Sequence, residues 1–209
     1  MSAAATTLLA YLLGSIPFAV IVSRAFGLPD PRSYGSGNPG ATNVLRTGKR
    51  AAAALTLVGD AFKGWLAVFL ASRMADAGAA EIAVSAAAVA ATLGHMYPVF
   101  LRFRGGKGVS TATGVLAALD PWLAAGAVAT WIIIAFFFRY SSLAALVAAA
   151  FAPFFAFFLH GMGRFTLAGA VGVTLIALLI AWRHQANIRN LIAGTEGRIG
   201  SGSSGSPQS

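Results

Sequence analysis

Seven apolar segments separated by polar stretches make up most of this chain. They cover residues 3–26, 51–72, 79–101, 109–119, 123–138, 143–159 and 165–182. A helix crosses the hydrocarbon core of a bilayer with about 20 apolar residues, and it satisfies its own backbone hydrogen bonds there. The pattern therefore predicts an all-α integral membrane protein. Gly14, Ser15 and Pro17 interrupt the first segment and predict close packing or a kink within it.

The segment 109–119 decides the topology, because it is short and ends at Asp120-Pro121. If it crosses, there are seven transmembrane helices, and one side of the membrane carries Arg24, Arg32, Arg46, Lys49, Arg50, Arg102, Arg104, Lys107, Arg139, Arg183, Arg189 and Arg198. The other side carries only Arg73 and Arg164. Because basic residues concentrate in cytoplasmic loops, the N-terminus is expected outside and the C-terminus in the cytoplasm. A re-entrant segment would put the basic C-terminal tail outside. A short crossing requires that the preceding loop dips into the membrane while buried in protein.

The composition fits a single membrane domain. The chain is 57% hydrophobic and 10% charged, whereas soluble domains carry about 25% charged residues. A net charge of +9 would suggest nucleic acid in a soluble protein, but here it indicates cytoplasmic loops and an anionic substrate. No cysteine is present, which excludes thiol nucleophiles. We expect one transmembrane domain over residues 1–198 and a disordered, low-complexity tail over 199–209, interpreted as an expression remnant.

The segment 94–114, GHMYPVFLRFRGGKGVSTATG, contains a short basic loop that leads into a new helix. Gly105, Gly106 and Gly108 allow backbone N–H groups to crowd together beside Lys107 and a helix N-terminus, which predicts a phosphate site. The alternative is a tight turn whose basic residues face lipid headgroups. The loop is not a Walker A motif, because the required early glycine and the Ser or Thr after the lysine are absent. His95 is expected to be a packed, hydrogen-bonded residue.

Two further polar segments are expected on the same side of the membrane. In residues 34–50, glycines alternate with hydrogen-bonding side chains, and Arg46 suits a phosphate or carboxylate. The candidate ligands there are Ser36, Gly37, Asn38, Gly40 and Asn43. In residues 182–197, His184 and Asn187 would share one helix face, and Gly194 suits a C-cap. The alternatives are a solvated loop for the first segment and a basic helix on anionic lipid for the second.

Three more residues are expected near these segments. Asp60 and Lys63 lie within the second apolar segment, where ionisable groups are costly, so we expect an ion pair that supports the site. Ser142 opens the sixth helix from the cytoplasmic side. It is either an N-cap or a side chain that reaches the site.

The three polar segments resemble the three cytoplasmic motifs of the bacterial membrane acyl-phosphate:glycerol-3-phosphate acyltransferases of the PlsY type. The matching stretches are GSGNPGATNVLR at 35–46, residues 94–114, and RHQANIRNLIAGTE at 183–196, and GSIPF at 14–18 fits as well. The resemblance implies seven transmembrane helices in the bacterial cytoplasmic membrane, with the active site facing the cytoplasm. It implies transfer of an acyl group from acyl phosphate to the 1-hydroxyl of glycerol 3-phosphate. Lysophosphatidate and inorganic phosphate are the expected products, as the first acylation of phospholipid synthesis.

The resemblance also implies roles for individual residues. The expected catalytic residues are Ser36, Arg46, Lys107, His184 and Asn187. The expected substrate-binding residues are Gly37, Asn38, Gly40, Asn43, Gly105, Gly106, Gly108 and Ser142, and the supporting residues are Asp60, Lys63, His95 and Glu196. The chain departs from the family pattern at Ala186, where a glutamate is usual, and at Asn190, where a basic residue is usual.

The general base remains open between a substrate phosphate oxygen and His184. No histidine is followed five residues later by an aspartate, so the dyad of acyl-CoA-dependent acyltransferases is absent. Acyl phosphate is an activated anhydride, so positioning could supply much of the rate enhancement. We expect no metal and no cofactor; the expected partners are glycerol 3-phosphate, acyl phosphate and membrane lipid. The rival functions are an organic-anion transporter, which would place basic residues near the membrane midplane, and a structural membrane protein with a lipid-binding face.

Overall fold

The computed structural model describes residues 1–200, and every regular element in that range is helical, which confirms the all-α prediction. The helices are α1 (Ala3–Gly14), α2 (Phe18–Ala25), α3 (Ala41–Leu45), α4 (Arg50–Met74), α5 (Ala80–Met96), α6 (Val109–Leu119), α7 (Pro121–Phe138), α8 (Ser141–Gly161), α9 (Leu167–Arg183) and α10 (Gln185–Ile192). Two short 3-10 helices, η1 (Ala77–Ala79) and η2 (Val99–Leu101), flank α5. Most of the predicted tail, residues 201–209, lies outside the described residues.

Five helical segments within residues 1–200 are long and apolar enough to cross a membrane. They are Ala3–Ala25, Arg50–Met74, Ala77–Leu101, Pro121–Phe138 and Ser141–Gly161. The pair α9 and α10 adds a sixth if it counts as one span, although the two helices meet at a bend of 60°. Helix α6 has 11 residues and is shorter than an ordinary span. The predicted segments therefore all form helices, while length and composition alone leave the count of seven crossings undecided.

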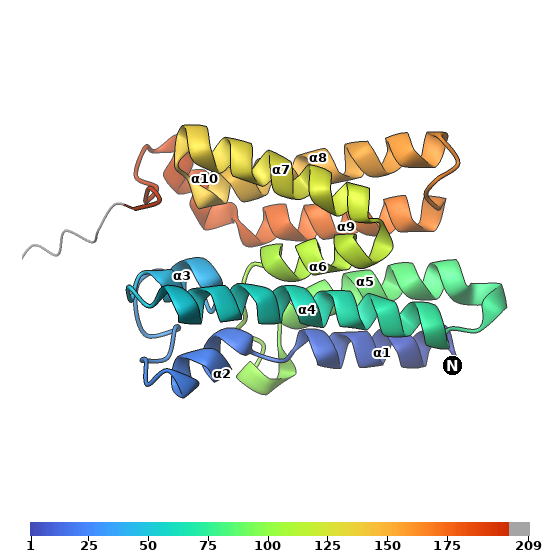
Figure 1. The fold of residues 1–209 in the computed structure, drawn as a ribbon, viewed down its shortest axis with the longest axis horizontal. Helices are drawn as coiled ribbons and strands as arrows, with labels where there is room; N and C mark the ends of the chain where they lie inside the picture. The colour runs from blue at the N-terminus through green and yellow to red at the C-terminus, as the bar shows by residue number, and fades with distance from the viewer. Residues whose placement is uncertain (201–209) are drawn as a thin grey trace, which may run out of the picture.

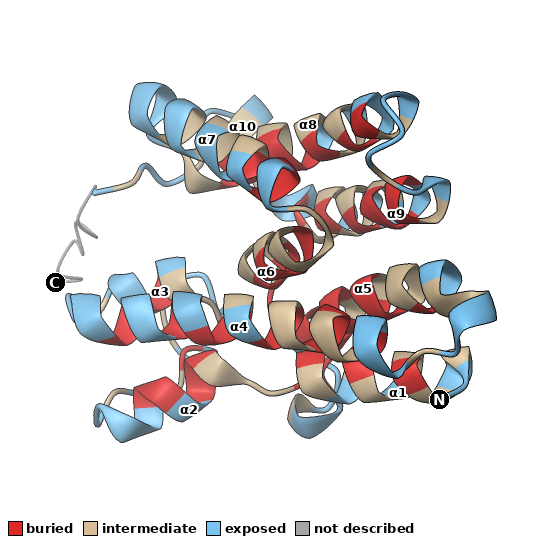
Figure 2. Ribbon diagram, turned by 45° about the vertical axis from the view of Figure 1, so that its right-hand side comes forward, coloured by how far each residue is buried: buried red, intermediate tan, exposed pale blue. Residues whose placement is uncertain are grey.

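The long helices run along a common axis, and α6 lies in the middle of the bundle (Figure 1). Helix α6 packs against α4 on one side and against α7 on the other, while α1 packs on α5 and α8 packs between α7 and α9. Buried residues face inward and exposed residues cover the outer helix faces (Figure 2). Many of these exposed side chains are large and apolar, Phe154 among them, as expected for a surface that faces lipid.

A break after Gly14 divides the first apolar segment into α1 and α2, which confirms the predicted interruption. Gly14 packs so closely on the backbone of Ala91 in α5 that a Cβ atom would clash with the Ala91 carbonyl. The Lys63 ammonium donates a hydrogen bond to the carbonyl oxygen of Ile16 over 2.7 Å, so a buried cation satisfies backbone that the break leaves without a helical partner. The break thus brings α4 and the α1–α2 junction together.

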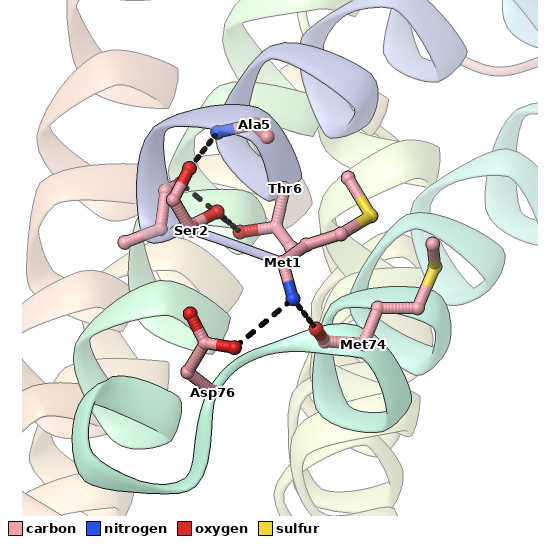
Figure 3. Close-up of polar contacts among 7 residues, drawn as sticks. Met1, Ser2, Ala5, Thr6, Met74 and Asp76 are labelled. Carbon is pink, nitrogen blue, oxygen red and sulfur yellow. Dashed lines mark hydrogen bonds and ion pairs between the residues drawn. The ribbon is translucent and has the colours of Figure 1, made fainter.

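The two ends of the bundle carry different segments. The N-terminal amine donates to the carbonyl oxygen of Met74 at 2.6 Å and to the carboxylate of Asp76 at 3.2 Å (Figure 3). At the opposite end the backbone N–H of Ile199 donates to the carbonyl oxygen of Arg139 at 2.6 Å. Helices α3 and α10, which belong to the first and third polar segments, lie at this second end (Figure 1). The fold therefore brings polar segments that are distant in sequence to one end of the bundle.

Candidate active site at one end of the helix bundle

The glycine-rich loop between η2 and α6 is folded back against the end of α5. The N–H groups of Gly105 and Gly106 donate to the carbonyl oxygens of Met96 and His95 over 3.2 and 3.1 Å. Both glycines are buried, and a Cβ atom at Gly105 would clash with the His95 carbonyl and Pro98, while one at Gly106 would clash with the His95 ring. These glycines permit close backbone approach, and their N–H groups are not free for the anion that the sequence predicted there.

Free N–H groups begin one residue later and continue into α6. The first helical backbone bond runs from Ala112 to the carbonyl oxygen of Gly108, which has a φ of 82°. Within residues 1–200, no hydrogen-bond partner exists for the N–H groups of residues 107–111. Such a helix N-terminus with a positive dipole end favours an anion. Of the predicted phosphate site, the structure therefore leaves the N–H groups of Lys107, Gly108 and the start of α6 available, while those of Gly105 and Gly106 are engaged.

Four side chains from three segments form one hydrogen-bonded chain beside α6. The Lys107 ammonium donates to Oδ1 of Asn187 at 2.6 Å, and Nδ2 of Asn187 donates to Oε1 of Glu196 at 2.7 Å. The hydroxyl of Ser142 donates to the same Glu196 oxygen at 2.6 Å. Ser142 is buried within α8, whose N-cap is Tyr140, so Ser142 reaches the site and is not an N-cap. One N–H of the Asn187 amide remains for a ligand.

The environment shifts the pKa of Lys107 below its ordinary value. Burial is the main cause, because it disfavours the charged ammonium, and the nearby Arg183 and Arg46 act in the same direction. The Glu196 carboxylate opposes this shift. A bound phosphate would also oppose it, since an adjacent negative charge stabilises the ammonium. Lys107 is therefore placed where an anion is electrostatically favourable.

His184 occupies the junction between α9 and α10, just beyond the last residue of α9. Its side chain is buried, and Nδ1 lies 2.8 Å from the carbonyl oxygen of Ile180, which requires a hydrogen on Nδ1. Burial lowers the pKa of His184 to about 4, although the Ile180 contact opposes the shift. The imidazole is thus neutral near pH 7, and Nε2 carries a lone pair. The chain therefore bends at His184, within the helix that was expected to carry both His184 and Asn187, but Gly194 has the positive φ, 71°, of the predicted C-cap.

The first polar segment is organised by one amide side chain. Oδ1 of Asn43 accepts the N–H of Ser36 at 3.0 Å, and Nδ2 donates to the carbonyl oxygens of Pro31 and Tyr34 at 2.7 and 3.2 Å. The amide of Asn43 is therefore committed to loop backbone. Arg46 and the side chain of Ser36 lie near the surface with Asn38 and Gly40, and all of them line the same cavity as Lys107.

A buried polar cluster lies behind the glycine-rich loop. Lys63 and Asp60 form an ion pair of 2.7 Å, and both side chains are almost fully buried. Nδ1 of His95 lies 3.4 Å from the Asp60 carboxylate and 3.0 Å from the hydroxyl of Thr111 in α6. The predicted Asp60–Lys63 pair and the predicted packed His95 are confirmed. The link between the two was not predictable from sequence spacing, because Asp60 and His95 lie on different helices.

One cavity of about 560 Å³ joins these groups. Its polar part contains Ser36, Arg46, Lys107, Ser142, His184, Asn187 and Glu196. Its apolar part extends between α4, α7, α8 and α9 and contains Leu57, Trp131, Ala145, Ala148, Ala149, Ala152, Val173 and Ile176. The cavity therefore suits an amphiphile with an anionic head and a long apolar tail.

Two residues that were not among the predicted site residues take part in this arrangement. Trp131 of α7 lines the apolar part of the cavity. Arg183, at the end of α9, donates to the carbonyl oxygens of Gly105 and Gly106. The position of Arg183 directly before His184 was the available signal for it, but a partner 77 residues away is not visible in the sequence.

The sequence model of the family described as glycerol-3-phosphate acyltransferase matches residues 4–194. Similar bacterial proteins carry the same name. The protein of Burkholderia pseudomallei strain 1710b is 61% identical over 194 residues, covering 93% of this chain and 94% of its own length. The protein of Bordetella petrii is 62% identical over 199 residues, covering 94% of this chain and 93% of its own length. The protein of Burkholderia thailandensis is 63% identical over 194 residues, covering 93% and 94%.

Two solved structures share the fold. The crystal structure of PlsY (YgiH), an integral membrane glycerol 3-phosphate acyltransferase, in its glycerol 3-phosphate form has a TM-score of 0.84 at 36% identity and covers 95% of this chain and 96% of that chain. The structure of the lysophosphatidic acid form has a TM-score of 0.83 at 36% identity and covers 95% of this chain and 95% of that chain. With a family model across nearly the whole chain and relatives above 60% identity, this multi-pass bacterial membrane protein belongs to the glycerol-3-phosphate acyltransferase family.

Proposed function

We propose that this protein transfers a fatty acyl group from acyl phosphate to the 1-hydroxyl of sn-glycerol 3-phosphate, giving lysophosphatidate and inorganic phosphate. The observation that carries this proposal is the single cavity, which combines cationic phosphate ligands with an apolar extension between helices. The solved relatives in glycerol 3-phosphate and lysophosphatidic acid forms support the acceptor and the product. The donor follows from the resemblance of the three polar segments to the acyl-phosphate-dependent family.

Both phosphates bind in the polar part of the cavity. Lys107 and the free N–H groups at the start of α6 form one set of ligands, and Arg46 with the hydroxyl of Ser36 forms the other. The acyl chain lies in the apolar part, beside the alanines of α8. This arrangement places the acyl carbonyl where the polar and apolar parts meet.

In the reaction, the 1-hydroxyl oxygen attacks the acyl carbonyl carbon, the new C–O bond forms, and the bond to the phosphate oxygen breaks. A substrate phosphate oxygen accepts the hydroxyl proton. His184 is a poor candidate for this base, because its low pKa makes Nε2 weakly basic. The remaining N–H of Asn187 donates to the carbonyl oxygen as negative charge develops, and Lys107 stabilises the departing phosphate.

The other site residues hold this arrangement in place. Glu196 and Ser142 orient the Asn187 amide, and Asn43 shapes the loop that carries Ser36. The cluster of Asp60, Lys63 and His95 supports the glycine-rich loop from behind, and His184 positions α10 relative to α9.

We also propose seven crossings in the bacterial cytoplasmic membrane, with the N-terminus outside and the active site facing the cytoplasm. Helix α6 is the short crossing: it rises about 16 Å, and the buried glycine-rich loop before it fills the remaining depth. The basic residues support this orientation, since they concentrate at the bundle end that carries α3 and α10.

The experiment that tests the function incubates purified protein with palmitoyl phosphate and glycerol 3-phosphate and measures release of phosphate together with formation of lysophosphatidate. Palmitoyl-CoA is the control donor, and a parallel reaction in EDTA tests the expected independence of metal ions. We expect product only with the acyl phosphate, in EDTA as well as without it. Turnover with palmitoyl-CoA and none with palmitoyl phosphate would reject the proposal.

A further inference from the structure

The guanidinium of Arg183 binds the backbone of the glycine-rich loop. Nε donates to the carbonyl oxygen of Gly106 at 3.2 Å, and a terminal nitrogen donates to the carbonyl oxygen of Gly105 at 3.0 Å. The guanidinium carbon lies over the ring of Tyr97, 5.2 Å from the ring centroid. Arg183 therefore joins the end of α9, the end of α5 and the loop.

This contact completes the hydrogen bonding of two consecutive glycines. Their N–H groups bind the end of α5, and their carbonyl groups bind Arg183. Glycines lose more conformational freedom on ordering than any other residue, and these two have no side chains with which to anchor the loop. These hydrogen bonds restrain the backbone of the loop from both sides.

The contact also sets the direction of a free donor. In a trans peptide the C=O of one residue and the N–H of the next point in opposite directions. Because Arg183 holds the carbonyl of Gly106, the N–H of Lys107 points away from Arg183, and it is the first of the free N–H groups that lead into α6. Lys107 lines the cavity, whereas Arg183 does not.

We propose that Arg183 is a positioning residue for this reaction: it sets the orientation of the Gly106–Lys107 peptide and so presents Lys107 and the start of α6 to a substrate phosphate. Arg183 acts through the loop and does not touch substrate. It also couples the third polar segment to the second, because it directly precedes His184. This inference rests on the proposed acyltransferase function.

The competing explanation is that Arg183 only attracts anions through its charge. Arg183→Lys separates the two explanations. A lysine keeps the charge, so it would preserve a purely electrostatic effect, but it lacks the planar guanidinium that binds two carbonyl groups, so it would not preserve the positioning effect. Arg189, an exposed residue of α10, provides a matched charge control.

The test measures kcat and KM for palmitoyl phosphate and glycerol 3-phosphate in Arg183→Ala, Arg183→Lys and Arg189→Ala. With the loop unanchored, we expect KM for at least one of the phosphate substrates to rise about tenfold or more in Arg183→Ala, with a smaller change in kcat. We expect Arg183→Lys to stay within a fewfold of Arg183→Ala, and Arg189→Ala to behave as the wild type. A wild-type KM in Arg183→Lys, or a loss confined to kcat, would overturn the proposal.

Hydrogen–deuterium exchange provides a readout that needs no turnover. We expect peptides that cover residues 102–109 to exchange faster in Arg183→Ala and Arg183→Lys than in the wild type, and to be unchanged in Arg189→Ala. Unchanged exchange in both Arg183 variants would overturn the positioning role. If the wild type itself produced no lysophosphatidate, the proposed function would fail, and this measurement would still decide whether Arg183 anchors the loop.

Discussion

Lys107 and Asn187 are 80 residues apart in sequence, yet the Lys107 ammonium donates to the Asn187 side chain over 2.6 Å. The contact fixes which end of the Asn187 amide faces which neighbour, since Nδ2 is held by Glu196. The glycine-rich loop and the segment after α9 therefore form one polar surface. The protein presents a cation, an amide N–H and a helix N-terminus to the same region of the cavity.

Replacing Lys107 with alanine removes the only ammonium among the residues of the described range, 1–200, that line this cavity. We expect Lys107→Ala to lose at least about a hundredfold in kcat/KM, because a charge-assisted contact to phosphate is lost in a buried site. Lys107→Arg should recover part of the activity. Phosphate release measures turnover, thermal unfolding in detergent verifies the fold, and Lys49→Ala, at an exposed position, is the control. Near-normal turnover of folded Lys107→Ala would refute the phosphate-binding role of this loop.

The positions of the helices and of the three polar segments were predictable, because apolar periodicity and glycine-rich spacing are local properties of a sequence. Helix α6 has the bounds that the pattern predicts, residues 109–119. The Asp60–Lys63 pair was also predictable, since the two residues lie three apart on one helix. The count of crossings and their orientation stay predictions, because α6 is shorter than the bilayer core.

Contacts between distant segments were not predictable. The sequence places Gly105 and Gly106 in an anion loop, but it does not reveal that α5 accepts their N–H groups. Asn43 looks like a substrate ligand in the sequence, yet its amide is fully engaged with loop backbone. The bend at His184 was missed because no proline or glycine marks it; the buried contact of its ring with Ile180 accompanies the bend.

The buried pair of Asp60 and Lys63 predicts a non-additive response to mutation. Asp60→Leu or Lys63→Met alone leaves one buried charge without its partner, and we expect each to cost about 3–5 kcal/mol of unfolding free energy. The double variant removes both charges, so it should cost clearly less than the sum of the single variants. Unfolding of detergent-solubilised protein measures all three. Additive losses would show that the two charges do not stabilise one another.

His184 predicts how stability depends on pH. Its pKa of about 4 in the folded protein lies below the ordinary value of 6.5, so between these two values the unfolded chain binds a proton that the folded protein does not. The stabilisation is present above pH 6.5 and falls as the pH drops toward 4, by roughly 3 kcal/mol in total. His184→Gln should lack this component in unfolding measured from pH 8 to 4.5. Parallel curves of unfolding free energy against pH for the wild type and His184→Gln would contradict the low pKa of His184. A limb in the pH profile of kcat/KM near pH 6–7 that disappears in the variant would also contradict it.

The alanines of α8 predict which residues limit the length of the acyl chain. Ala152 lines the apolar part of the cavity ten residues beyond Ser142, a distance of about 15 Å along the helix. A leucine at this position would fill the deep end of the space in which we place the acyl tail. Ala152→Leu should therefore favour lauroyl phosphate, whose chain is four methylene groups shorter, over palmitoyl phosphate. We expect the ratio of their kcat/KM values to change by about tenfold or more, since the misfit of even one methylene group has an effect of this size. Ala150→Leu is the matched control, because Ala150 lies exposed on the outer face of the same helix. A similar change in both variants, or no change in Ala152→Leu, would mean that the acyl chain does not extend along α8.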